Sequence, residues 1–350
     1  PVQLPVIETI DLNKIPGKSK PAITEPLAEA ITASLQQNRQ VILFQNRRGY
    51  SPYLICDTCG WIPHCTQCDV TLTYHKARNQ LSCHYCGSSY PLVQTCAACG
   101  SHHFLQKNFG TEKIEELIAE QFPDARIARM DYDSVKGKHD HDALIKLFEQ
   151  HRIDILVGTQ MVVKGLDFEK VDLVGIVDAD SILNFTDFRV NERAYQLMEQ
   201  VSGRAGRKNG NGKVLVQVSN PRHPVLQFVR EHDFGRLYHY ETGNRKQFAY
   251  PPFTRLIKII FKHREKHLAE EAANIMMQGL YPHFGAYAQG PAQPVVDRVR
   301  NQYLWELLLK LPKDARLIRQ CKHEVRQQTV IIQSNKRYRS VTILPDVDPV

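Results

Sequence analysis

Eight cysteines form four Cys-x-x-Cys pairs, and all of them lie between residues 56 and 99. The pairs are Cys56 with Cys59, Cys65 with Cys68, Cys83 with Cys86, and Cys96 with Cys99. Each pair presents two thiolates from a tight turn, and two pairs complete a tetrahedral zinc site. Disulfides are the alternative, but no secretion signal precedes the cysteines, so we expect reduced thiols. We predict two zinc ions held by cysteine alone, which makes both sites structural rather than catalytic.

The spacing of the pairs favours a nested arrangement. Five residues separate Cys59 from Cys65, whereas fourteen separate Cys68 from Cys83, enough for a hairpin. We expect Cys56, Cys59, Cys96 and Cys99 on one zinc, and Cys65, Cys68, Cys83 and Cys86 on the other. Sequential and interleaved pairing remain the alternatives. Because eight cysteines fill two sites, we expect the nearby histidines to be surface residues and Cys321 to be an inert thiol.

Aromatic residues alternate with the cysteine pairs: Trp61, Tyr74, Tyr85 and Tyr90. In a small zinc-binding segment such rings pack the minimal core, which is our first interpretation. Stacking on the bases of single-stranded nucleic acid is the alternative.

A second group of chemically active residues occupies Gln200-Val201-Ser202-Gly203-Arg204-Ala205-Gly206-Arg207. Arg204 and Arg207 are three residues apart, so on a helix they share a face. The small residues around them let the backbone approach a ligand, and two guanidinium groups can then grip one polyphosphate. The alternative is a solvated helix end, where arginines suit the helix dipole.

Strands and helices in an α/β pattern must position these groups. Apolar runs at 41–44, 153–157 and 171–177 predict buried strands, and segments 25–37, 111–118 and 142–151 predict helices. In the last of these we expect Leu144, Leu147 and Phe148 to face inward. Polar residues follow the strands, including Arg47, Arg48 and Thr159. In open α/β sheets such carboxyl-end turns carry the chemistry.

The composition is that of a soluble protein with two or three domains. Of the 350 residues, 42% are hydrophobic and 23% charged. No apolar run approaches the roughly 20 residues that span a bilayer. The first residue is Pro1 rather than methionine, so we expect a processed or excised piece of a cytoplasmic protein.

The positive charge is concentrated in the last third of the chain. The net charge is +8, and residues 255–340 hold sixteen Lys and Arg against seven Asp and Glu. A basic surface indicates contact with nucleic acid, although a solvated basic face explains it equally well. Here a helix-like bridge at 225–240 precedes a β-α-β-β-α-β order, which predicts a small α+β domain. Phosphates or an acidic peptide are candidate ligands for its basic residues: Arg298, Arg300, Lys313, Arg316 and Arg319.

The spacing of the polar turns resembles three motifs of superfamily 2 helicases. The turn with Arg47 and Arg48 resembles motif IV, Thr159 with Gly165 and Asp167 resembles motif V, and Gln200 with Gly203, Arg204 and Arg207 resembles motif VI. With the eight-cysteine insertion between motifs IV and V, the chain resembles the C-terminal portion of the PriA family of primosomal replication-restart helicases. The resemblance covers essentially the whole chain.

The resemblance implies a fold and a domain order. We expect a RecA-like second helicase lobe with a mostly parallel sheet at 1–54 plus 101–222. A zinc-binding insertion occupies 55–100, and a small α+β domain occupies 223–350. The resemblance also supports the nested zinc pairing.

The resemblance further implies the C-terminal half of an ATP-dependent 3′-to-5′ DNA helicase that recognises abandoned replication forks and promotes primosome assembly. Arg204 and Arg207, with Gln200, would act on the γ-phosphate, and Gly165 and Asp167 would meet the nucleotide. Contacts to DNA would come from Thr159, Lys164, Arg47, Arg48 and Arg189. For Arg189 and the aromatic residues beside it, helix packing is an equal alternative.

The 350 residues contain neither a Walker A loop nor a Walker B sequence. Phosphoryl transfer needs a phosphate cradle with Mg²⁺ opposite the arginines, so we expect ATP with Mg²⁺ to bind only when a first lobe is present. Forked and single-stranded DNA, single-stranded-DNA-binding protein and primosome proteins are the expected partners of a monomer. The alternative function is a zinc-ribbon adaptor that binds DNA and proteins without an ATPase activity of its own.

Overall fold

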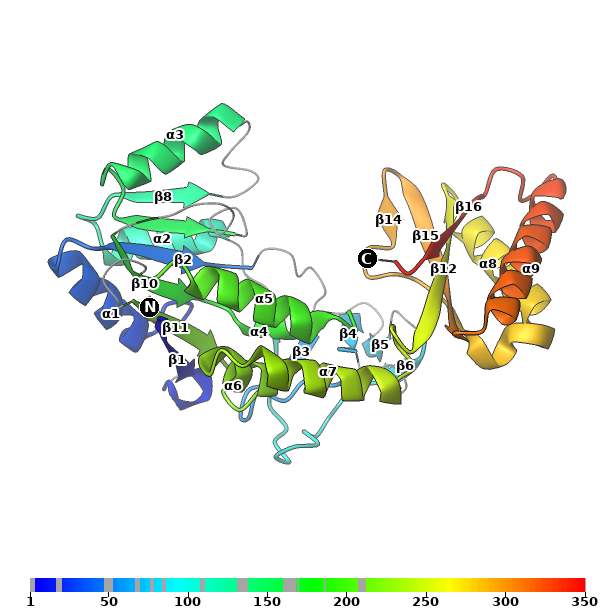
Figure 1. The fold of residues 1–350 in the computed structure, drawn as a ribbon, viewed down its shortest axis with the longest axis horizontal. Helices are drawn as coiled ribbons and strands as arrows, with labels where there is room; N and C mark the ends of the chain where they lie inside the picture. Colours follow the sequence, from blue (N-terminus) through cyan, green and yellow to red (C-terminus); the bar gives the residue numbers. More distant parts are fainter. Residues whose placement is uncertain are drawn as a thin grey trace. The chain divides into compact units, whose positions relative to one another are not determined.

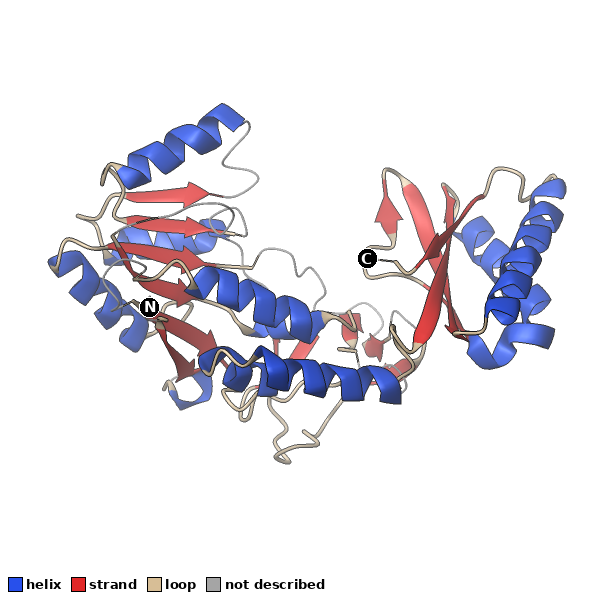
Figure 2. Ribbon diagram, in the orientation of Figure 1, coloured by secondary structure: helices blue, strands red, loops and turns tan. Residues whose placement is uncertain are grey.

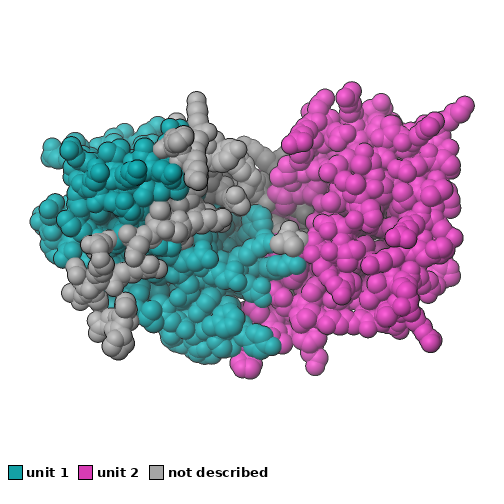
Figure 3. Space-filling view, turned by 45° about the horizontal axis from the view of Figure 1, so that its top comes forward, with its two compact units in different colours: residues 1–62, 94–185, 189–238 teal, residues 63–93, 186–188, 239–350 magenta. Residues whose placement is uncertain are grey.

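The computed structural model of the protein describes residues 4–16, 21–46, 53–66, 70–75, 79–83, 86–107, 111–130, 138–159, 168, 170–185, 187–206 and 212–349. The chain divides into two compact units (Figure 3). Residues 1–62, 94–185 and 189–238 belong to the first, and residues 63–93, 186–188 and 239–350 to the second. Across the described ranges, no helix is both long and apolar enough to cross a bilayer. The three-part domain division stays a prediction.

A six-stranded parallel sheet is the centre of the first unit (Figure 1). All of its neighbouring strands run parallel. This confirms the mostly parallel sheet that the sequence predicts. The strand order is β1 (Val6–Asp11), β11 (Lys213–Val218), β10 (Val171–Ile176), β2 (Gln40–Phe44), β9 (Ile155–Gly158) and β8 (Ile127–Met130).

Helices cover both faces of this sheet, as the two buried faces of a parallel sheet require. Side chains alternate along each strand, so Val41 and Leu43 pack on one face while Ile42 and Phe44 pack on the other. The first face is covered by α1 (Glu25–Gln36) and α2 (Thr111–Gln121). The second is covered by α3 (Lys138–Glu149), α4 (Asp180–Leu183), α5 (Val190–Ser202) and α6 (Pro224–Arg230). The short 3-10 helix η1 (Leu12–Lys14) follows β1.

Three sequence predictions about helices are wrong in detail. Helix α5 ends at Ser202, so Arg204 lies beyond it rather than on its face. Leu147 is 46% exposed, and Ile145 is buried in its place beside Phe148. The single bridge predicted at 225–240 is two helices, α6 and α7 (Phe234–Gln247), because His232 between them has a φ of 51° that no α-helix accommodates.

The cysteine-rich segment adds two small antiparallel sheets. In the first unit, β3 (Tyr53–Cys56) pairs with β7 (Phe104–Lys107). In the second unit, β4 (Thr73–His75), β5 (Gln80–Ser82) and β6 (Ser89–Pro91) form a three-stranded sheet.

The rest of the second unit is an antiparallel sheet with two helices on one face (Figure 2). Along the chain it runs through β12 (Thr254–His263), α8 (Lys266–Phe284), β13 (Ala288–Ala292), β14 (Arg298–Val299), β15 (Gln302–Pro312), α9 (Ala315–Ser334) and β16 (Thr342–Val347), with the 3-10 helix η4 (Gly285–Tyr287) after α8. The sheet order β13-β15-β12-β16 is that of a split β-α-β fold. This confirms the predicted α+β domain, to which the short β14 is an addition.

Candidate metal centres and the arginine turn

The four Cys-x-x-Cys pairs share one turn geometry. In each, the backbone N–H of the first cysteine donates to the carbonyl five residues later, at 2.8 to 2.9 Å. The acceptors are Trp61, Val70, Ser88 and Ser101. A glycine follows three of the pairs, and Gly60, Gly87 and Gly100 have φ values of 75°, 77° and 75°. Glycine adopts this left-handed conformation without strain, so the residue after the second cysteine helps each turn to close.

The first candidate metal centre joins the first and last pairs. The sulfurs of Cys56, Cys59, Cys96 and Cys99 all lie within 4.8 Å of one another. Cys56 Sγ is 3.6 Å from Cys99 Sγ, and Cys59 Sγ is 3.6 Å from Cys96 Sγ. Four thiolates around one zinc at about 2.3 Å lie roughly 3.8 Å apart. The geometry therefore fits a zinc ion, and the grouping is the one that nested pairing expects.

The second candidate centre has three described ligands: Cys65, Cys83 and Cys86. Cys65 Sγ is 3.6 Å from Cys86 Sγ, which again matches thiolates around one metal. Cys68, the predicted fourth ligand, lies outside the described residues. With the first centre formed by the outer pairs, these three cysteines are the ones that nesting leaves for a second ion.

The thiols of the first centre are electrostatically suited to a cation. Burial opposes ionisation of Cys56, but hydrogen bonds from the backbone N–H groups of Cys59 and Thr58 outweigh it and lower its pKa to about 7. Burial and the neighbouring sulfurs raise the pKa of Cys59 to about 12. Four thiolates at this spacing repel one another, so a divalent cation is what lets all of them ionise together.

The carboxyl edge of the parallel sheet holds Thr159. The N–H of Thr159 donates to the Met130 carbonyl at 3.3 Å, and the N–H of Gln45 donates to the Gly158 carbonyl at 2.9 Å. The chain that follows Gln45 leads to Arg47 and Arg48, and the chain that follows Thr159 leads to Lys164; all three lie outside the described residues. Two of the segments with predicted DNA contacts therefore leave the sheet at neighbouring strand ends.

The turn that carries Arg204 lies at the opposite, amino edge. Past the end of α5, the N–H of Gly206 donates to the carbonyl of Val171, the first residue of β10, at 2.9 Å. Phe168 is 2% exposed, and the Lys170 carbonyl accepts from the N–H of Gln40 at 3.0 Å. The start of β10 is thus fixed beside the turn with Arg204, and Val171 follows Asp167 by four residues in the sequence. The sequence led us to expect functional residues at the carboxyl ends of the strands. The turn with Arg204 lies at the amino edge instead.

The other predicted site residues that the structure describes lie in α5 or next to its ends. Gln200 is exposed in the last turn of α5, and Arg189 is the half-buried residue that precedes that helix. Arg204 is half-buried. Gly165, Asp167 and Arg207 lie outside the described residues, so their predicted roles at the nucleotide stay predictions.

Asp180 is a residue whose role the sequence did not indicate. Its carboxylate is 1% exposed and accepts hydrogen bonds from the Ser219 N–H at 3.0 Å and the Ser219 Oγ at 2.7 Å. This links the start of α4 to the end of β11. Burial, with the charges of Asp178 and Asp180, raises the pKa of Tyr53 well above its ordinary value. No sequence signal marks the pair, because Ser219 is 39 residues away.

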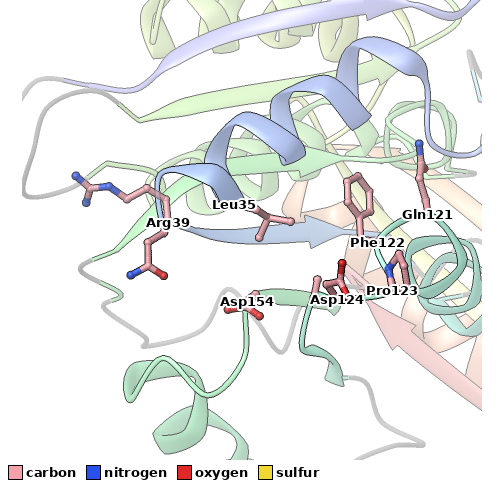
Figure 4. A pocket seen from close by; sticks show the side chains of 9 residues that line it. Leu35, Arg39, Gln121, Phe122, Pro123, Asp124 and Asp154 are labelled. Carbon is pink, nitrogen blue, oxygen red and sulfur yellow. The ribbon is translucent and has the colours of Figure 1, made fainter.

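A surface pocket also opens at the amino edge of the sheet (Figure 4). Leu35, Arg39, Phe122 and Asp154 are among the residues that line it. Hydrogen bonds from the Arg126 side chain, at 2.9 Å through Nε, lower the pKa of Asp154. Of the predicted site residues that the structure describes, none lines this pocket.

A comparison with known families first defines the class: the chain contains a helicase C-terminal domain. The family model described as the helicase conserved C-terminal domain matches residues 102–209, which hold β10, α5 and the arginine turn. The structure of RecG bound to a three-way DNA junction shares 12% identity over 69% of this chain and 22% of that one, at a TM-score of 0.38. The class assignment rests on the family model and the parallel sheet, because a TM-score this low carries no weight.

Two further family models and two similar proteins then identify the family within this class. The PriA DNA helicase Cys-rich region matches residues 65–91, and the primosomal protein N C-terminal domain matches 246–350. The replication restart protein PriA of Bacillus subtilis is 34% identical over 94% of this chain, and that of Synechocystis sp. is 36% identical over 90%. The chain belongs to the PriA family. It spans 42% and 39% of the length of these two relatives.

Proposed function

We propose that this chain is the C-terminal half of an ATP-dependent 3′-to-5′ DNA helicase that recognises abandoned replication forks and promotes primosome assembly. The observation that carries the proposal is the hydrogen bond from Gly206 to Val171. It holds the turn of Arg204 beside Val171, which follows Asp167 by four residues in the sequence. Our proposal is that the guanidinium group of Arg204 and the carboxylate of Asp167 act on the same nucleotide.

In this proposal the arginines act on an ATP molecule whose phosphates and Mg²⁺ are held by a separate first lobe. Arg204 and Arg207 stabilise the charge that develops on the γ-phosphate, and Gln200 supports them. Asp167 and Gly165 contact the nucleotide. The zinc ions hold the cysteine-rich insertion, and the domain division at 54, 100 and 222 is part of the same proposal. We place the protein in the bacterial cytoplasm.

Substitution of the arginines tests the nucleotide role. In the full-length protein, Arg204→Ala and Arg207→Ala should each slow fork-dependent ATP hydrolysis by about 10³-fold while leaving nucleotide affinity nearly intact. Arg230→Ala, at the exposed end of α6, is the matched control and should change neither quantity. Unchanged turnover in the Arg204 and Arg207 variants would remove the proposed role.

DNA contacts are proposed at the carboxyl edge, from Thr159, Lys164, Arg47 and Arg48, with Arg189 beyond β10. These positions follow neighbouring strands of one sheet, so one DNA strand can meet several of them. Replacing Lys164 or Arg47 should weaken binding to all sequences alike and reduce the salt dependence of binding by roughly one phosphate contact each. Strand displacement from substrates with a 3′ or a 5′ tail tests the polarity.

Partner binding is proposed for the basic surface of the C-terminal domain. Arg298, Arg300, Lys313, Arg316 and Arg319 are all exposed. Forked DNA, the acidic tail of single-stranded-DNA-binding protein and the primosome proteins are the candidate ligands. Glu substitutions at Arg316 and Arg319 should weaken the relevant partner by an order of magnitude or more, because they reverse the local charge. Retained affinity for every candidate would exclude this face.

The second candidate function is a zinc-ribbon adaptor without ATPase activity. The absence of Walker A and B sequences from these 350 residues favours it for the chain taken alone. An ATPase assay with forked DNA separates the two functions. The 350-residue chain should show no turnover, whereas the full-length protein should hydrolyse ATP. A full-length protein that binds forks but never hydrolyses ATP would establish the adaptor instead.

A further inference from the structure

The two candidate metal centres differ in whether a side-chain hydroxyl lies within hydrogen-bond distance of a sulfur. Backbone N–H groups are the donors at the first centre: those of Cys59 and Thr58 bond Cys56, and that of Ser101 bonds Cys99. Among the described residues, no side-chain hydroxyl bonds a sulfur of that centre. At the second centre, Tyr90 Oη lies 3.3 Å from Cys65 Sγ, and Ser88 Oγ lies 3.1 Å from Cys86 Sγ.

Two equivalent serines show that this difference does not follow from the local sequence. Ser88 and Ser101 each stand two residues after the second cysteine of a pair, and each accepts the N–H of the first cysteine through its carbonyl. The Ser88 hydroxyl bonds a sulfur, whereas the Ser101 hydroxyl bonds Thr58 Oγ1 at 2.8 Å. The same turn therefore places a serine hydroxyl against a sulfur at one centre only, where the Cys86 thiol donates to Ser88 Oγ as long as it keeps its proton.

Tyr90 reaches its sulfur across the small sheet of the second unit. It lies on β6, opposite Leu81 of β5, and its hydroxyl is 3.3 Å from Thr66 Oγ1 as well as from Cys65 Sγ. Thr66 is in the turn of the Cys65 pair, and Tyr90 follows the Cys83 pair. One phenol group thus connects the two turns that must stay together around a metal.

We propose that Tyr90 and Ser88 set how firmly the second centre retains its metal, an inference that rests on the proposed zinc binding. Once the cysteines are thiolates, both hydroxyls donate to sulfur. A donated hydrogen bond withdraws charge from the sulfur, which makes it a weaker base and a weaker nucleophile. Protons and oxidants then detach the sulfur from zinc more slowly, and a chelator that captures the zinc once a sulfur has left removes the metal more slowly as well. Ligand-orienting partners of this kind change metal affinity by about 10- to 100-fold.

Metal release from the zinc-loaded chain tests the inference. A colorimetric zinc chelator under reducing conditions should remove one equivalent from each centre in two kinetic phases. Tyr90→Phe keeps the ring, removes the donor, and should accelerate one phase by about 10-fold without changing the other. Ser88→Ala should accelerate the same phase. Two unchanged phases, or equal acceleration of both, would overturn the proposal.

Two matched control variants distinguish the loss of a hydroxyl at the sulfur from a general destabilisation of the small sheet. Tyr74→Phe removes a hydroxyl that contacts Asn79 Oδ1 in the same small sheet, and Ser101→Ala removes the equivalent serine hydroxyl of the first centre. Neither should accelerate the phase that Tyr90→Phe changes. If Tyr74→Phe accelerates it equally, the effect comes from the sheet and not from the donor.

Cadmium NMR supplies a spectroscopic readout. The chain loaded with two cadmium ions should give two resonances in the range of four-sulfur sites, and Tyr90→Phe should shift only one of them. A wild-type chain that binds fewer than two ions would contradict the proposed zinc binding itself. Two bound ions with resonances that Tyr90→Phe leaves in place would contradict only the role of Tyr90.

Discussion

The ring of Phe188 stacks on the ring of Tyr250, with centroids 4.3 Å apart and planes 5° from parallel. A cation lies over each ring: the Arg245 guanidinium is 5.3 Å from the centroid of Phe188, and Lys310 Nζ is 3.8 Å from that of Tyr250. Lys310 Nζ also donates to the Phe248 carbonyl at 3.0 Å. Arginine and lysine over aromatic faces stabilise the column, so Phe188 has a packing role within the second unit.

Phe188→Leu should therefore destabilise the second unit by about 1–2 kcal/mol, because it keeps apolar volume but removes the stacking and the cation–π contact. Phe234→Leu is the control, since Phe234 is 60% exposed and its loss should change stability by less than about 0.5 kcal/mol. Urea unfolding followed by circular dichroism measures both. Equal midpoints for the two variants would show that the column contributes little.

Gly60 and Gly100 allow a comparison of two turns with the same backbone conformation. Both have a φ of 75°, where a Cβ is strained. A Cβ on Gly60 would lie 2.4 Å from the Ser219 carbonyl oxygen, whereas nothing lies within 4 Å of one on Gly100. Gly100→Ala should cost about 1 kcal/mol from strain alone, and Gly60→Ala a further 1–3 kcal/mol from the clash. Thermal unfolding with zinc bound measures the difference, and equal melting temperatures would argue against the close approach of Gly60 to Ser219.

Asp180 and Asp178 form a second matched pair. Asp180→Ala leaves the Ser219 N–H and hydroxyl buried without their acceptor, and it should destabilise the first unit by about 3–5 kcal/mol. Asp178 is half-buried and accepts from the Ser181 N–H at 3.3 Å, so Asp178→Ala should cost about 1 kcal/mol. Chemical denaturation of the two variants measures the free energy of unfolding that each substitution removes. A milder effect at Asp180 than at Asp178 would mean that Ser219 finds other partners.

The sequence predicted those features that depend on local pattern. Apolar runs indicated β2, β9 and β10 of the parallel sheet but not β1 or β11, and the spacing of the cysteine pairs indicated which sulfurs meet at the first centre. The end of α5 at Ser202 was missed although Gly203, its C-cap residue, is a helix-stop signal present in the sequence. The contacts of Asp180 with Ser219 and of Tyr90 with Cys65 join residues far apart in the chain, so no local pattern marks them.

Cys321 provides the last prediction, because it is the one cysteine outside the predicted zinc sites. Its side chain is 0% exposed within the apolar cluster between α8, α9 and the sheet. Burial, with a smaller effect of Glu324, raises its pKa to about 11. At pH 8 only about one such thiol in a thousand is ionised, and the thiolate is the reactive form.

Thiol titration at pH 8 should therefore proceed in three stages. The zinc-loaded chain should show almost no fast-reacting thiol, since the eight other cysteines are bound to metal and Cys321 is buried. Adding a zinc chelator should release about eight reactive thiols, and guanidinium should then expose the ninth. Cys321→Ser should abolish the final stage alone. Nine fast thiols after chelation would mean that the C-terminal core opens when the metal leaves, so that folding of the two regions is coupled.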